Sequence, residues 1–286
     1  MQPRVQAFFD PATSTATYLI SDPATKTAAV IDPVLDFEPR AAKLSTASAD
    51  AVLEAARAQG LTLAYVLETH AHADHLSAAD HIRRRSGAAI VIGAEIVQVQ
   101  ATFASLFEID DLAPGGGDFD RLVGEGETLE LGELAIQVLH TPGHTPADVT
   151  YLVGDCAFVG DTLFMPDYGT ARTDFPGGDA ATLYRSIQKI LALPDATRVF
   201  VGHDYLPPGR QDFRWETTVT DQRAHNVHAA AGVSEADFVA LRDARNRELA
   251  PPTLILPALQ VNIRAGALPQ PSPKGRVFLR LPVTMA

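Results

Sequence analysis

One short segment constrains the fold of this 286-residue chain more than any other, because four histidine and aspartate side chains fall within six positions. The segment follows the apolar run 63–67, which is typical of a buried strand, and precedes a helical pattern. Its four candidate ligands are His70, His72, Asp74 and His75. Side chains two positions apart in an extended segment point the same way, so the first two can hold one ion while the last two turn toward an adjacent position. The segment therefore predicts a metal site where a strand meets a helix.

Three further candidate ligands follow predicted strands later in the chain. His144 comes after a strand at 134–139 and a Pro-Gly turn, Asp161 after a strand at 157–159, and His203 after a strand at 198–201. A single residue of this kind is more often a capping or surface residue. Together with the first cluster, however, the side chains can converge at one edge of a pair of sheets, where loops on a rigid scaffold carry chemistry.

The rest of the pattern indicates strands and helices. Strands are expected at 16–20, 28–31, 63–67, 89–92, 128–131, 134–139, 149–153, 157–159 and 198–201, and helices at 48–59, 76–85, 179–193 and 234–248. Asp-Pro pairs at 22–23 and 32–33 bound the first two strands and indicate turns. The order strand, helix, strand at 63–92 and the four successive strands at 128–159 favour two sheets packed together with helices outside. We expect a single α/β (α+β) domain over 1–286, with its core at about 8–248 and an extension at 249–286 packed on it.

Charge and cysteine content exclude several classes of protein. Lys and Arg number 23 against 35 Asp and Glu, and the net charge of −12 repels phosphate backbones and anionic membranes, so neither nucleic acid nor a membrane is an expected partner. Cys156 is the only cysteine, so no intramolecular disulfide can form, and we interpret it as a small packed residue. The N-terminal residues lack a signal-peptide pattern, and no apolar run approaches the roughly 18 residues that cross a bilayer. We therefore expect a cytoplasmic protein.

The motifs together resemble the metallo-β-lactamase superfamily. The resemblance is carried by THAHADH at 69–75, TPGH at 141–144, GDTLF at 160–164 and GHDY at 202–205, and runs from about residue 8 to the helix at 234–248. It implies an αββα sandwich of two mixed β-sheets flanked by helices. The segments GTARTDF at 169–175, TLY at 182–184 and NIR at 262–264 are further similar to the persulfide dioxygenases, also called sulfur dioxygenases, which are related to glyoxalase II.

The resemblance to the persulfide dioxygenases implies a mononuclear Fe(II) site, one iron per chain, held by His70, His144 and Asp161. It also implies that a low-molecular-weight thiol persulfide, such as glutathione persulfide, is oxidised with O2 to sulfite and free thiol. Two histidines and a carboxylate leave positions open, as non-haem iron oxygen chemistry requires. The other cluster members would support these ligands or form a second metal site; they are His72, Asp74, His75 and His203.

Substrate contacts are implied by the same resemblance. Arg172 and Tyr205 match positions that hold the glutathione part of the substrate in the dioxygenases. The planar guanidinium suits a carboxylate, and the alternative interpretation is an ion pair with Asp174 that orders the loop. The chain departs from glutathione-using relatives at His228, where they carry a second arginine, and it has an additional stretch at 207–215. Which persulfide is used therefore stays open.

Ligand identity alone leaves a second enzyme class open, the dinuclear zinc hydrolases of thioesters or lactones, which include glyoxalase II. In that interpretation two Zn(II) ions are bound, the first by His70, His72 and His144 and the second by Asp74, His75 and His203, with Asp161 bridging. A third alternative is a non-catalytic binding or oligomerisation module, whose signature would be a lost ligand, yet every candidate ligand is present. A homo-oligomer and a separate sulfurtransferase partner are compatible with the sequence, which decides neither.

Overall fold

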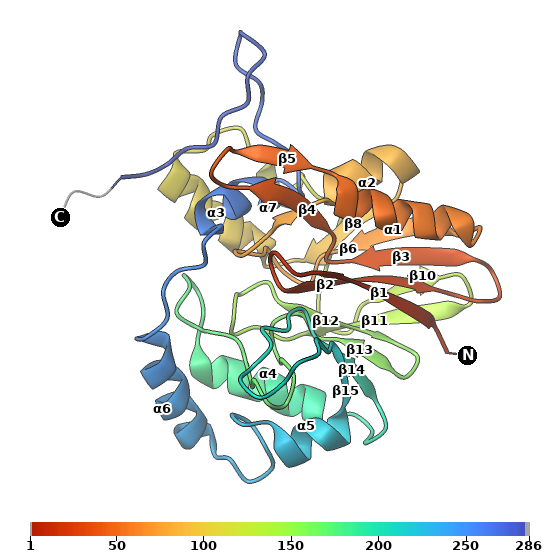
Figure 1. Ribbon diagram of the computed structural model, residues 1–286, viewed down its shortest axis with the longest axis vertical. Helices are drawn as coiled ribbons and strands as arrows, with labels where there is room; N and C mark the ends of the chain where they lie inside the picture. Colours follow the sequence, from red (N-terminus) through yellow and green to blue (C-terminus); the bar gives the residue numbers. More distant parts are fainter. Residues whose placement is uncertain (1, 284–286) are drawn as a thin grey trace.

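The computed structural model describes residues 2–283 and consists of four layers, namely helices, two sheets and helices again (Figure 1). The first sheet has the strand order β1-β2-β3-β6-β8-β9, and the second runs from β10 to β15 in chain order. A small third sheet has the order β5-β4-β7. The arrangement confirms the predicted αββα sandwich of two mixed sheets.

The first half of the chain builds the first sheet, the small third sheet and three helices. Its strands are β1 Arg4–Asp10, β2 Thr15–Ser21, β3 Thr27–Ile31, β4 Val34–Glu38, β5 Lys43–Ser45, β6 Thr62–Leu67, β7 Leu76–Ser77, β8 Ala89–Gly93 and β9 Arg121–Val123, and its helices are α1 Ala47–Ala58, α2 Ala79–Ser86 and α3 Ile96–Phe107. The strands β1, β2 and β3 are antiparallel, whereas β3, β6, β8 and β9 are parallel. This confirms the predicted strand, helix, strand unit.

The second half builds the other sheet and the remaining helices, of which α7 returns to the first helical layer. Its strands are β10 Thr128–Leu131, β11 Leu134–His140, β12 Val149–Val153, β13 Cys156–Phe158, β14 Arg198–Phe200 and β15 Glu216–Thr218, and its helices are α4 Ala180–Leu191, α5 Val219–His225, α6 Glu235–Asn246 and α7 Ile255–Asn262. The strands from β10 to β13 pair in antiparallel fashion, as expected, and β13 pairs with β14 in parallel.

Three apolar clusters hold the layers together. One lies between the first sheet and helices α1, α2 and α3, a second lies between the two sheets around Tyr18, Tyr151 and Phe158, and a third joins the second sheet to α4 through Leu183 and Ile187. Burying each large apolar side chain stabilises the fold by about 1.5–3 kcal/mol. The sheets therefore form a stiff scaffold for the loops at their edges.

The helix predicted at 76–85 begins later than expected, at Ala79. Leu76 and Ser77 form β7 instead, which pairs with β4. The Ser77 backbone N–H also donates to Asn262 Oδ1 (2.7 Å), so tertiary partners hold this residue in an extended conformation. Besides β7, the elements that the sequence patterns did not predict are β1, β4, β5, β9, β15, α3, α5 and α7.

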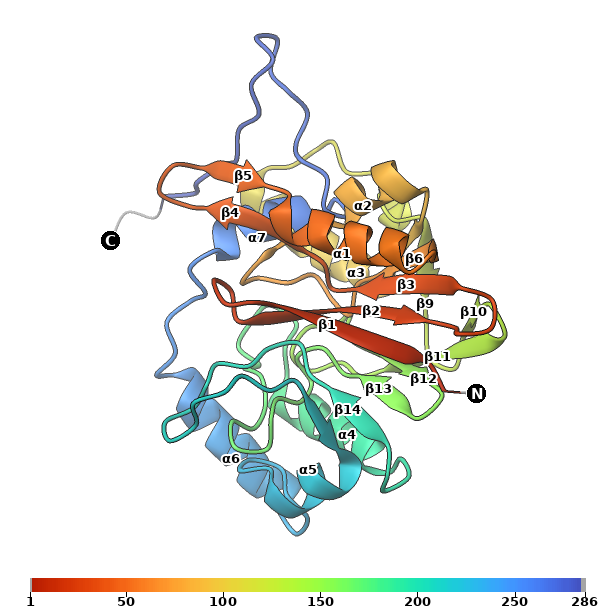
Figure 2. The same cartoon turned by 45° about the vertical axis from the view of Figure 1, so that its right-hand side comes forward.

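The C-terminal part of the described chain returns to the first helical layer. Helix α7 packs against α3 and β7, and the following residues extend beyond that layer as a long loop (Figure 2). The expected division into one domain with a core and an extension stays a prediction. Within residues 2–283, no helix is long and apolar enough to span a membrane.

Candidate metal centre

The loops that follow four strands meet at one edge of the sandwich. The loop after β6 comes from the first sheet, and the loops after β11, β13 and β14 come from the second. They bring the predicted ligands into two sets of mutually close donor atoms. The three-residue group contains His70, His144 and Asp161, and the four-residue group contains His72, Asp74, His75 and His203.

Within the three-residue group, both imidazoles face the same carboxylate oxygen. Asp161 Oδ2 lies 3.6 Å from His144 Nε2 and 4.0 Å from His70 Nε2. His144 Nδ1–H donates to the backbone carbonyl of Arg172 (2.8 Å), which leaves Nε2 free to act as a ligand. The site therefore presents two ring nitrogens and a carboxylate toward one point.

A hydrogen-bonded chain orients His70. The Thr69 hydroxyl donates to Asp32 Oδ2 (2.8 Å), so its oxygen can accept from His70 Nδ1 at 3.0 Å. This fixes the tautomer in which His70 Nε2 carries the free electron pair. Burial lowers the pKa of His70 well below its ordinary value, and the nearby His72 lowers it further, so the ring is neutral at neutral pH.

The four-residue group adjoins the first through Asp161. His203 Nε2 lies 3.1 Å from Asp74 Oδ2 and 3.2 Å from Asp161 Oδ1. His75 Nδ1–H donates to the backbone carbonyl of Leu76 (3.2 Å), and burial lowers the pKa of His75 to about 3. These residues could hold a second ion beside the first.

His72 differs from the other histidines because two buried carboxylates face it. Its Nε2 lies 3.0 Å from Asp32 Oδ1 and 3.5 Å from Glu68 Oε2. Burial opposes a charged ring, but Asp32 and Glu68 outweigh it and raise the pKa of His72 well above its ordinary value. Without a metal, these carboxylates favour a protonated His72 ring. Its Nδ1 has no hydrogen-bond partner among the described residues, so it could bind a metal once the ring loses a proton.

The donor atoms fit a bound metal. Six of the seven candidate ligands carry a buried side-chain nitrogen or oxygen that has no hydrogen-bond partner among the described residues. Leaving such an atom unpaired costs about 1–3 kcal/mol, and a cation that binds several of them removes that cost. Imidazole and carboxylate ligands suit iron and zinc alike.

Sequence reasoning missed the carboxylates that support the ligands. Asp32 was interpreted only as a turn residue, yet it is 2% exposed and contacts both Thr69 and His72. Glu68, the residue directly before the motif at 69–75, was given no role. Asp148 was not considered, although its Oδ1 lies 3.6 Å from His70 Nδ1 and burial raises its pKa to about 7. A buried aspartate directly after a strand and close to a histidine motif was the available signal.

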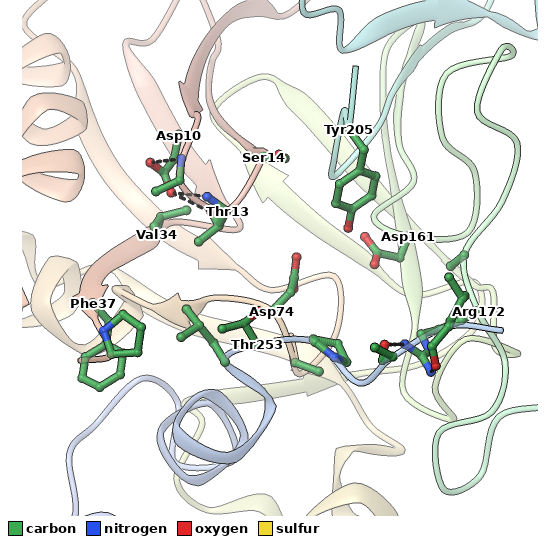
Figure 3. Close-up of a pocket in the computed structure, with 18 of the residues that line it drawn as sticks. Asp10, Thr13, Ser14, Val34, Phe37, Asp74, Asp161, Arg172, Tyr205 and Thr253 are labelled. Atoms are coloured by element: carbon green, nitrogen blue, oxygen red, sulfur yellow. Dashed lines mark hydrogen bonds between the residues drawn. The ribbon is translucent and has the colours of Figure 1, made fainter. Parts of the chain in front are cut away.

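A cavity of about 960 Å³ opens over the candidate metal centre. Asp74, His144 and Asp161 contribute to its lining, and Val34 and Phe37 line its apolar side. Figure 3 shows the Asp74 and Asp161 carboxylates close to each other in this space. The volume is in the range of small-molecule sites.

Tyr205 and Arg172, the predicted substrate contacts, both line the cavity. The Tyr205 hydroxyl points toward the Asp161 carboxylate (Figure 3). The Arg172 guanidinium forms two hydrogen bonds to Asp174 (2.7 Å each) and a third to the carbonyl of Ala250 (2.7 Å). Arg172 thus forms the ion pair with Asp174 that the sequence offered as an alternative to a substrate contact. A role of Arg172 as a substrate contact stays a prediction.

His228 lies beneath the loop that carries Arg172. It is 5% exposed, and its Nδ1 accepts a hydrogen bond from the Thr170 backbone N–H (3.1 Å). Burial, together with the nearby Arg242, lowers the pKa of His228 to about 4, so the ring is a neutral acceptor. In this chain His228 therefore positions a loop.

The additional stretch at 207–215 packs against the first sheet. The rings of Phe213 and Trp215 lie 4.4 and 5.7 Å from that of Phe9 in β1, measured between centroids. Arg210 forms an ion pair with the buried Asp204, the residue after His203. The stretch therefore anchors the loop that carries His203 and Tyr205.

Comparison with known proteins assigns the family. Residues 10–203 match the model of the metallo-beta-lactamase superfamily. With the sandwich and the histidine-aspartate loops already described, the match means that the chain belongs to the metallo-β-lactamase superfamily.

Several relatives are similar over nearly the whole chain. A probable metallo-hydrolase of Burkholderia pseudomallei is 50% identical and covers 98% of this chain and 98% of its own length. A beta-lactamase hydrolase-like protein of Xylella fastidiosa is 49% identical over 98% of this chain, but the chain spans only 65% of that longer relative. The mitochondrial persulfide dioxygenase ETHE1 of Mus musculus is 32% identical and covers 94% of this chain and 91% of its own length.

A solved structure has a similar fold. The crystal structure of ETHE1 from Myxococcus xanthus matches with a TM-score of 0.74 and 34% identity, covering 92% of this chain and all of that one.

Proposed function

We propose that this protein is a persulfide dioxygenase that oxidises a low-molecular-weight thiol persulfide, such as glutathione persulfide, at a mononuclear Fe(II) site. One iron per chain would be held by His70, His144 and Asp161. The observation that carries the proposal is that the donor atoms of these three side chains lie close together, whereas His72 belongs to the other group, with Asp74, His75 and His203. A zinc hydrolase would need His72 as a further ligand of the same ion.

The overall reaction is balanced by one water molecule. R–S–SH, O2 and H2O give R–SH and sulfurous acid, which ionises to sulfite. The two sulfur atoms of the persulfide together lose four electrons and O2 gains four, so no other oxidant or reductant is required. When bound, Fe(II) would supply open positions at which the persulfide sulfur and O2 meet.

The side chains of this chain supply positioning and charge. The Asp161 carboxylate offsets positive charge at the centre, and the Arg172 carbonyl and the Thr69 hydroxyl fix the two imidazoles. Burial raises the pKa of the Tyr205 hydroxyl well above its ordinary value, as do Asp74 and Asp161. Tyr205 therefore keeps its proton at neutral pH and can donate a hydrogen bond to a substrate atom near the centre.

The relatives support both the proposal and its main alternative. The mouse persulfide dioxygenase resembles this chain along nearly its whole length. The more similar Burkholderia protein is named a metallo-hydrolase, and the four-residue group is also complete. The second candidate function is therefore a dinuclear zinc hydrolase of thioesters or lactones, similar to glyoxalase II.

Parallel assays on one preparation separate the two functions. Protein purified without oxygen would be given glutathione persulfide while O2 uptake and sulfite are measured, and the same sample would be given thioester and lactone substrates. We expect O2 and sulfite to change in a one-to-one ratio with little hydrolysis. Rapid thioester hydrolysis without O2 uptake would reject the dioxygenase proposal.

A further inference from the structure

Helix α6 places two arginines on the wall of the cavity. Arg242 and Arg245 lie in its last turns, three positions apart, so they share one face of the helix. Both line the cavity over the metal centre. Neither residue belongs to the motifs from which the function was predicted.

Arg242 carries a buried charge whose hydrogen-bond partners are all neutral. It is 2% exposed, its Nη1 donates to the Thr170 carbonyl (2.9 Å), and its Nε donates to the Asn246 side chain (3.1 Å). Burial and the nearby Arg245 lower its pKa to about 10, so it stays positively charged at neutral pH. Arg172, by contrast, is paired with the Asp174 carboxylate. Arg242 therefore forms no ion pair among the described residues, although the Asp174 carboxylate lies within electrostatic range of it.

Arg245 is the accessible member of the pair. Its side chain is exposed, lines the cavity, and has no hydrogen bond or ion pair with the residues described here. An arginine without a partner beside a buried arginine creates a positive potential that attracts anions. Its planar guanidinium can bind a carboxylate through two hydrogen bonds.

Aromatic side chains connect this wall to the metal centre. Both arginines lower the pKa of Tyr168, against the larger effect of burial, so they lie within electrostatic range of its hydroxyl. The ring of Tyr168 is 5.0 Å from that of Tyr205, whose hydroxyl points toward Asp161 (Figure 3). A small molecule with its sulfur at the centre could therefore extend along these rings to α6.

The opposite wall of the cavity is unsuited to an anion. Asp36 accepts hydrogen bonds from the Ser48 backbone and hydroxyl (3.0 and 2.6 Å), and Glu38 accepts from the backbone of residues 40 and 41. Asp36, Glu38 and Lys43 all line the cavity, so this wall presents two acidic side chains and one basic side chain. A negatively charged part of a ligand is therefore directed toward α6.

We propose that Arg245, backed by Arg242, binds a carboxylate of the substrate and so selects anionic persulfides over neutral ones. The inference rests on the proposed function for the reaction but concerns only how the substrate is recognised. It assigns the carboxylate contact to α6, because Arg172 is paired with Asp174 and His228 is a neutral residue beneath the loop.

Binding of two matched thiols tests the proposal. Glutathione and glutathione diethyl ester differ in that the ester lacks both carboxylate charges. Their dissociation constants would be measured by calorimetry, without oxygen, on iron-loaded wild type and on Arg245→Gln. We expect the variant to bind glutathione about tenfold more weakly, as for the loss of a hydrogen bond between charged groups. Its affinity for the diester should change by less than about twofold.

Two matched variants control for other effects. Arg247→Gln removes a charge two positions further on, outside the cavity lining, and should leave both dissociation constants unchanged. Arg245→Lys keeps the charge but loses the planar fork, so glutathione affinity should fall by less than in Arg245→Gln. Equal loss in Arg245→Gln and Arg247→Gln would overturn the proposal. So would a wild-type protein that binds the diester as tightly as glutathione.

The binding measurement separates this inference from the reaction. If glutathione affinity depends on Arg245 but no persulfide supports O2 uptake, then the carboxylate site stands and the dioxygenase proposal fails. If O2 uptake is observed and Arg245→Gln does not change the KM for glutathione persulfide, then the carboxylate site fails and the dioxygenase proposal stands.

Discussion

His70 and His72 lie two positions apart on one loop, yet their surroundings favour a neutral ring at His70 and a protonated ring at His72 in the metal-free protein. His70 Nδ1 lies against the Thr69 hydroxyl, and burial keeps the ring neutral. His72 faces two carboxylates, which outweigh burial and keep its ring protonated. Proximity in sequence therefore does not make two histidines equivalent ligands. The polar and charged groups that face each ring set its protonation state, and a protonated ring must lose a proton before it binds a metal.

The same contrast separates the two ligand groups. In the three-residue group, both histidines have a free Nε2 directed at Asp161. In the four-residue group, His72 must first lose a proton that Asp32 and Glu68 stabilise. We infer that the first ion binds at the three-residue group.

Asp161→Ala should have the largest effect, because this residue is the carboxylate of the three-residue group and also contacts His203. We expect O2 uptake to fall to background and the bound iron to be lost, measured by metal analysis of folded protein. Asp167→Ala is the control, since that aspartate pairs with Arg210 at 2.9 Å outside the cavity. A full iron equivalent in Asp161→Ala would reject its assignment as a ligand.

Asp32→Asn should weaken metal binding by about 10–100-fold, the usual cost of losing a carboxylate behind a ligand. Asp32 orients His70 through Thr69 and also holds His72. Competition with a chelator would measure the affinity. Asp22→Asn is a matched control, because Asp22 is equally buried before a proline and accepts turn hydrogen bonds far from the centre. Equal metal affinity in Asp32→Asn and Asp22→Asn would show that Asp32 does not support the metal ligands.

His203→Asn sharpens the comparison between the groups. In a mononuclear dioxygenase, this change should leave one iron per chain and reduce O2 uptake by less than about tenfold. The reason is that His203 contacts Asp161 Oδ1 but is not itself a member of the three-residue group. A dinuclear hydrolase would lose a metal and nearly all activity. Loss of iron from His203→Asn would contradict the division into two groups.

The protonation of His72 should have the smallest effect, a pH-dependent contribution of this one ring to the stability of the metal-free protein. Its folded-state pKa lies above the unfolded value of about 6.5, so its protonation stabilises the metal-free protein fully below that pH. This contribution is lost as the pH rises through the folded-state pKa. Imidazole NMR shifts of the metal-free protein should show a protonated His72 near neutral pH, and Asp32→Asn should lower its pKa. A neutral His72 at pH 6.5 would contradict the contrast with His70.

Much of the fold and site could be predicted because the signals are local. Alternating apolar runs marked the strands, and the motif at 69–75 marked the strand end that carries His70. The chain passes from β6 to α2 through an extra strand, β7, because Ser77 is held by the distant residues Val34 and Asn262. No local pattern contains that information.

The supporting groups could not be predicted for the same reason. Asp32 and His72 are forty positions apart and meet only because β3 and β6 are parallel neighbours in the sheet. Likewise, Arg245 reaches the cavity only because α6 packs against the second sheet's helix α4 on the side of the candidate centre. Motifs identify ligands, whereas the sheet order determines what surrounds them.

Anomalous diffraction at the iron edge, from crystals grown without oxygen, tests the central claim most directly. The account predicts one iron peak between His70 Nε2, His144 Nε2 and Asp161, with His72 still directed at Asp32. Two metal peaks, or a single metal bound by His72, would contradict it.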